Sequence, residues 1–148
     1  MKKFTLETDI PDSFLLLGIA SQEKSHRMAW LLNQHSSFQL YKEDDLILYK
    51  NDLPIAYFNR FDFTDEINRT SYTLLDNSFE NSHLLPELKN ISYLIIIKGA
   101  LDFLKLDELI QKIKTINGVQ LVSKIDISKL KSVVQLILPE SKSQKLLL

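Results

Sequence analysis

The chain has 148 residues, of which 45% are hydrophobic and 25% are charged, the ordinary composition of a folded globular domain. The absence of Cys excludes a disulfide scaffold, a thiolate metal site and a Cys nucleophile, and a count of only 3 Gly excludes a glycine-rich phosphate loop. The formal net charge of -1 lacks the basic excess typical of nucleic-acid binding, so no nucleic-acid partner is predicted.

The first predicted elements are a strand and a helix. The short apolar run 14–20 favours a buried strand. Ser21 is a suitable N-cap for a helix over 23–35, in which apolar side chains recur at helical spacing. Those side chains are Met28, Leu31 and Leu32, with Ala29 and Trp30 widening the stripe.

The middle of the chain predicts an antiparallel meander. Alternating side chains indicate a hairpin over 38–50, whose turn is the acidic run 43–45, since Asp tolerates turn geometry. A second turn is expected at 51–54. Strands are expected at 55–63 and at about 69–76.

A connector with few periodic signals is expected over 77–90, followed by a strand at 91–98. The regular apolar stripe over 102–117 predicts a second helix, capped by its first residue and stopped by its Asn-Gly end. Further strands are expected at 119–126 and 133–138.

The strand–helix–strand pattern therefore occurs near both ends of the chain. It predicts one α+β domain over residues 1–139, with a largely antiparallel sheet and two main helices packed on one face. Residues 140–148 are expected to form a flexible C-terminal tail. The apolar runs are too short to span a bilayer, and no signal peptide is recognised, so we expect a cytoplasmic protein with no membrane partner.

No metal site, cofactor or catalytic residue is predicted. His26 and His35 lie nine residues apart rather than at the i, i+4 spacing of a metal pair, and His83 lies in the connector. The run 43–45 lacks the glycine and ligand spacing of a calcium loop. No serine lies in a Gly-x-Ser-x-Gly elbow.

A group of aromatic residues is expected in the core. Were some of them exposed on an open sheet face, they would mark an interface. The group consists of Trp30, Tyr57, Phe58, Phe61 and Phe63.

The segment 85–93, Leu-Pro-Glu-Leu-Lys-Asn-Ile-Ser-Tyr, lies where the connector meets a strand. Pro86 stiffens the entry and keeps the preceding residue extended. Glu87 could cap a short turn, and Tyr93 could reach a backbone acceptor from the strand. These three residues form the candidate site, in a structural or a binding role.

The same segment resembles the motif of the bacterial IPExxxVDY family. Pro86, Glu87 and Tyr93 match the motif, Leu85 and Ile91 replace its Ile and Val, and Ser92 stands where the family has Asp. The stretches 14–21, 27–33 and 125–131 also resemble the family's opening and ending. The resemblance implies a small bacterial protein without an established activity, and it supplies no catalytic residues.

Three functions remain open. The first is a non-enzymatic protein-binding module, acting as a homodimer or a small adaptor. It is favoured by the charge division between residues 1–66 (11 acidic, 7 basic) and 67–148 (8 acidic, 11 basic). The second is a small-molecule-sensing regulatory domain of ferredoxin-like outline, whose ligand is unknown. The third is an enzyme with a carboxylate site using Asp62, Glu66 or Glu87.

Overall fold

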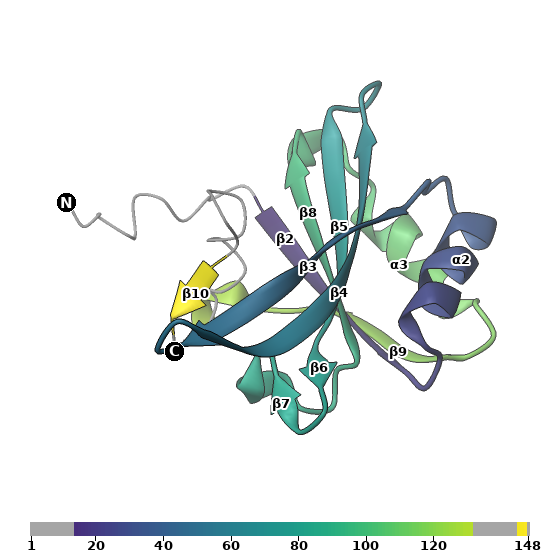
Figure 1. Cartoon of the computed structure of the whole chain (residues 1–148). Helices are drawn as coiled ribbons and strands as arrows, with labels where there is room; N and C mark the ends of the chain where they lie inside the picture. Colours follow the sequence, from purple (N-terminus) through teal and green to yellow (C-terminus); the bar gives the residue numbers. More distant parts are fainter. Residues whose placement is uncertain (1–13, 132–144, 148) are drawn as a thin grey trace.

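The computed structural model describes residues 14–131 and 145–147, which form a single-domain α+β fold. Within these residues one large sheet has the strand order β10-β3-β4-β5-β8-β2-β9. Every neighbouring pair is antiparallel except the edge strand β10, which runs parallel to β3 (Figure 1). Its strands are β2 (Phe14–Ser21), β3 (Tyr41–Lys50), β4 (Leu53–Asp65), β5 (Thr70–Asp76), β8 (Tyr93–Gly99), β9 (Val119–Lys124) and β10 (Lys145–Leu147).

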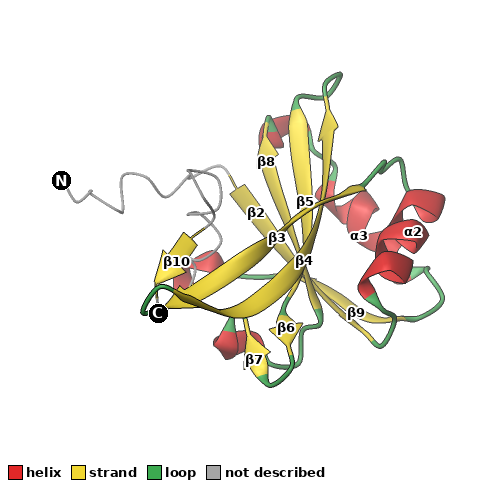
Figure 2. Ribbon diagram, viewed as in Figure 1, coloured by secondary structure: helices red, strands yellow, loops and turns green. Residues whose placement is uncertain are grey.

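Two helices, α2 (Ser25–His35) and α3 (Leu106–Lys114), lie on one face of this sheet, as the apolar periodicity predicts (Figure 2). Their buried side chains join those of the strands beneath them in one core cluster. From the helices this cluster takes Met28, Ala29, Leu31, Leu32, Leu109 and Ile113.

The opposite face of the sheet is covered by irregular segments rather than by helices. The short strands β6 (Ser78–Phe79) and β7 (Ser82–His83) and the 3-10 turns η1 (Pro86–Leu88) and η3 (Ile127–Lys129) lie on this side. A second core cluster forms between these segments and the sheet. Because β2 and β8 are covered on both faces, they are continuous apolar runs instead of alternating strands.

The prediction of a hairpin over 38–50 is wrong. β3 runs straight through the acidic residues 43–45, and a register shift against β4 between Glu43 and Leu46 accommodates them. β4 is 13 residues long, so it can pair with both halves of β3. β3 and β4 instead form a hairpin with each other. Its turn lies at Asn51 and Asp52, both with positive φ, within the expected second turn.

The second helix is shorter than expected. Leu101–Phe103 forms a separate 3-10 turn, η2, and Leu104 is extended, so α3 begins at Leu106 and Asp102 is not its N-cap. The first helix begins at Ser25, and its N-cap is Lys24 rather than Ser21. A helical apolar pattern does not distinguish a 3-10 turn from the first turn of an α-helix, which explains the shift at α3.

The chain order of strands differs from the β-α-β-β-α-β arrangement of a ferredoxin-like outline, because six strands, β3 to β8, lie between α2 and α3. The strand expected at 133–138 lies outside the described residues. β10 falls within the expected C-terminal tail, whose flexibility stays a prediction.

Candidate functional site

The connector after β5 is held in place by a buried asparagine. The Asn77 side chain is fully buried. Its Nδ2 donates to the carbonyls of Leu88 and Ile91 at 2.8 and 3.0 Å, and its Oδ1 accepts from the backbone N–H of Leu85 at 2.8 Å. These three bonds satisfy backbone groups of an irregular segment that has no sheet partner. The sequence offers no signal for this role, because Asn77-Ser78 has the composition of an ordinary turn.

The motif residues lie on the segment that Asn77 anchors, and their contacts are within the chain. Pro86 opens η1. Glu87 Oε2 accepts from the backbone N–H of Lys131 at 2.6 Å, which ties the connector to the chain just after η3. The Tyr93 hydroxyl donates to the carbonyl of Glu23, so the expected bond from this strand to a backbone acceptor is confirmed. These contacts favour a structural role for the motif.

A polar cavity of about 330 Å³ lies beside Tyr93. In its wall, burial raises the pKa of the Asp76 carboxyl to about 6, against the opposing effect of hydrogen bonds from Asn59. Oδ1 of Asp76 is buried without a hydrogen-bond partner. Burial also raises the pKa of Tyr93, and the nearby carboxylates of Asp76 and Glu23 add to this effect. Both side chains therefore stay protonated over a wider pH range than usual.

The cavity beside Tyr93 is lined almost entirely by polar side chains. Its lining residues are Ser21, Glu23, Lys24, Asp76, Ser78, His83, Lys89, Ile91, Ser92 and Tyr93.

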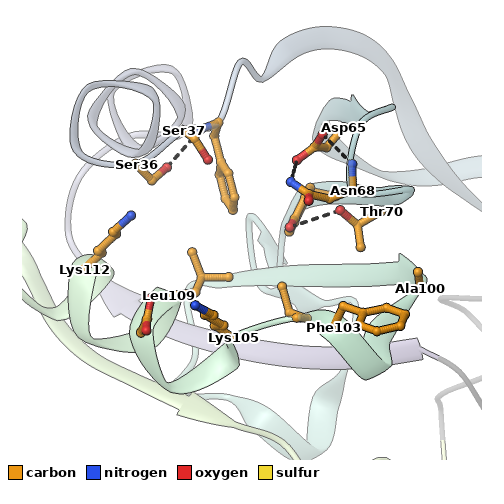
Figure 3. Close-up of a pocket in the computed structure, with 14 residues that line it drawn as sticks. Ser36, Ser37, Asp65, Asn68, Thr70, Ala100, Phe103, Lys105, Leu109 and Lys112 are labelled. Atoms are coloured by element: carbon orange, nitrogen blue, oxygen red, sulfur yellow. Dashed lines mark hydrogen bonds between the residues drawn. The ribbon is translucent and has the colours of Figure 1, made fainter.

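A second pocket, of about 260 Å³, lies between the end of α2, the start of α3 and the turn that joins β4 to β5 (Figure 3). Its floor is apolar and its rim carries lysines, carboxylates and hydroxyls. We call it the α2–α3 pocket. Its lining includes Ser36, Ser37, Phe38, Asp65, Asn68, Thr70, Tyr72, Ala100, Phe103, Leu104, Lys105, Glu108, Leu109 and Lys112.

The far part of the β3–β4 hairpin carries apolar side chains that helices do not cover. Ile47 pairs directly with Tyr57, so both point to the same face. Tyr57 and Ile55 are 41% and 40% exposed, whereas Ala56 between them is buried on the other face. Figure 1 shows this part of the hairpin running away from α2 and α3. We call Ile47, Ile55 and Tyr57 the hairpin face.

The aromatic group expected in the core is divided by the structure. Phe58 and Phe61 are buried and Phe63 is half-buried, as expected. Trp30 and Tyr57 are instead exposed, Trp30 by 50%, and Arg27 lies 4.9 Å above the Trp30 ring. Helical or alternating position alone did not show how far the covering helices extend.

The three carboxylates of the enzyme hypothesis lie in different settings. Asp62 forms an ion pair with Arg60 at 2.9 Å and accepts from Thr73. Glu66 is exposed in the β4–β5 turn, and Glu87 binds the backbone of Lys131. None of the three lines either pocket described above.

The histidines are also dispersed: His26 and His35 are exposed on α2, and His83 is half-buried on β7. In the part of the chain that the structure describes, no three His, Asp or Glu residues group into a metal site. Within that part no helix has the length and apolar character needed to cross a membrane.

Comparison with known proteins adds no further identification. No family model matches the chain, and no curated protein or solved structure matches it at a significant level.

Proposed function

We propose that the protein is a non-enzymatic binding module that associates with a second copy of itself through the hairpin face. The observation that carries this proposal is the exposure of Ile55 and Tyr57 beside Ile47, on the part of the sheet's helix-side face that the helices do not cover. Contiguous apolar surface of this kind on a folded protein is typical of an interaction site. The separate settings of Asp62, Glu66 and Glu87 support binding over catalysis.

A second copy is the occupant that suits this face best. An apolar patch is complementary to itself across a two-fold axis, because it brings no like charges together. The edge of β3 beside it already pairs with β10, which favours a contact through side chains over one that adds a strand to this edge.

The test is the molar mass measured by light scattering across a concentration series from the micromolar range upward. We expect a rise toward twice the 17.2 kDa of one chain. Ile55→Lys places a charge on the hairpin face and should keep the protein monomeric. Ile67→Lys is the matched control, since Ile67 is 93% exposed in the β4–β5 turn and should leave the mass unchanged.

A wild-type protein that remains at 17.2 kDa throughout the series would overturn the proposal. Dimerisation that survives Ile55→Lys would place the interface elsewhere and overturn the role of the hairpin face.

A further inference from the structure

The floor of the α2–α3 pocket is a rigid part of the core. Phe38, Tyr72 and Leu109 are buried and belong to the cluster beneath the helices. The rings of Phe38 and Tyr72 lie 4.6 Å apart, and Tyr72 stacks on Phe63 at 5.7 Å. Side chains packed in this way keep their positions whether or not a ligand is present. The pocket therefore offers a preformed apolar surface.

One end of the pocket has a spare hydroxyl proton. Thr70 and Tyr72 are 3% and 7% exposed, and Thr70 Oγ1 donates to the Tyr72 hydroxyl at 3.3 Å. Two hydroxyl groups hold two protons, and this bond uses only one of them. Among the hydrogen bonds between described residues, the other proton has no acceptor. Because buried polar groups are normally hydrogen-bonded, a ligand acceptor fits this position.

A ligand group that accepts this proton should be neutral, because a carboxylate of the protein lies nearby. Asp65 lies at the same end of the pocket (Figure 3). Hydrogen bonds from the side chain and backbone of Asn68 and from the backbone of Ile67 hold the pKa of Asp65 below its usual value, so it stays charged. A second carboxylate placed here would be repelled by it.

The α3 side of the pocket carries cations. Lys105, the N-cap residue of α3, and Lys112, in the last turn of the helix, are both exposed and both line the pocket. Glu108 also lines it, and among the described residues no ion pair joins Glu108 to either lysine. Figure 3 shows Lys112 directed toward Ser36 and Ser37, across the pocket from Thr70. This end can bind an anion by charge-assisted hydrogen bonds.

We propose that the α2–α3 pocket binds a small carboxylate with a hydroxyl or carbonyl group at its opposite end. The carboxylate meets Lys105 and Lys112, the neutral oxygen meets the hydroxyl pair of Thr70 and Tyr72, and the apolar middle packs on the floor. The volume of about 260 Å³ suits a molecule of single-ring size, since pockets for drug-sized ligands measure roughly 300 Å³ or more. The proposal does not depend on dimerisation, because the pocket and the hairpin face share no residue.

The test titrates 4-hydroxybenzoate into the ¹⁵N-labelled full chain and follows backbone amide signals by NMR. We expect saturable shifts at residues 36–38, 65–72 and 100–112. Benzoate lacks the neutral oxygen and 4-hydroxybenzamide lacks the charge, so each should bind about tenfold more weakly.

Two variants locate the two ends of the ligand. Lys112→Gln should weaken 4-hydroxybenzoate about tenfold, whereas Lys114→Gln, on the same helix outside the pocket, should leave the affinity unchanged. Tyr72→Phe should remove the preference over benzoate, whereas Tyr41→Phe at an exposed site should keep it.

Three results would each overturn the proposal. They are the absence of saturable shifts with 4-hydroxybenzoate, equal affinity for the three probes in the wild type, and unchanged affinity in Lys112→Gln. The comparison of the three probes uses the unmodified chain, so it tests the proposed ligand site even where a variant does not fold.

Discussion

The two faces of the sheet are covered by different kinds of segment. The face beneath α2 and α3 is covered by two amphipathic helices, whose side chains enter the core at regular intervals. The opposite face is covered by a connector without periodic pattern, yet Leu84 and Leu85 of that connector are completely buried. An irregular segment can therefore cover a sheet when buried side chains form hydrogen bonds with its backbone groups.

The largest expected effect comes from removing the buried amide of Asn77. Asn77→Ala removes three hydrogen bonds between a buried side chain and the backbone of the connector, so we expect the free energy of unfolding to fall by about 4 kcal/mol. The matched change on the helical face is Asn33→Ala, which removes two bonds to the backbone of Leu40 at a half-buried site. It should cost about 1 kcal/mol.

Chemical denaturation of both variants measures the difference. Equal losses for Asn77→Ala and Asn33→Ala would show that the connector is not held by its buried asparagine.

The packing of the two faces can be compared directly with one truncation on each. Leu84 in the connector and Ile113 on α3 both have no exposed surface. Leu84→Ala and Ile113→Ala should each lower the free energy of unfolding by about 3 kcal/mol, through lost burial and the cavity left behind. A loss below about 1 kcal/mol for Leu84→Ala would mean that the connector relaxes into the cavity more readily than α3 does.

The smallest expected effect concerns Asp76, at the end of β5 where the connector begins. Its pKa is raised from 3.8 to about 6, so the folded state binds this proton more tightly than the unfolded state. The contribution of Asp76 to stability therefore falls as the pH rises from about 4 to about 6. Asp76→Asn should raise the free energy of unfolding at pH 7 by about 1 to 2 kcal/mol, below the roughly 3 kcal/mol of the full shift because the carboxyl is partly exposed.

Unfolding curves at pH 4 and pH 7 measure this gain, which should disappear at pH 4. Asp44→Asn, at an exposed position of β3, is the control. A variant less stable than the wild type at pH 7 would show that the Asp76 charge is compensated in the folded state.

The regular elements of the helical face could be predicted because each depends on local spacing. Periodic apolar residues placed α2 and α3 to within a few residues, and the run at β2 was recognised as a buried strand. The acidic run in β3 was misread as a turn, since pairing with the long strand β4 overrides the local preference of Asp for turns. Tyr93 was identified for its reach to a backbone acceptor, but its acceptor, Glu23, is 70 residues away.

The fold class of the protein follows from its amino-acid sequence alone. Apolar periods of about 3.6 and 2 residues specify the helices and strands, and they require a sheet covered by helices on one face. What covers the other face, which side chains remain exposed and where the pockets lie became known from the three-dimensional structure. Those features depend on residues distant in sequence, such as Asn77 and Ile91, which are hydrogen-bonded, or Thr70 and Lys112, which line one pocket, and no local pattern encodes them.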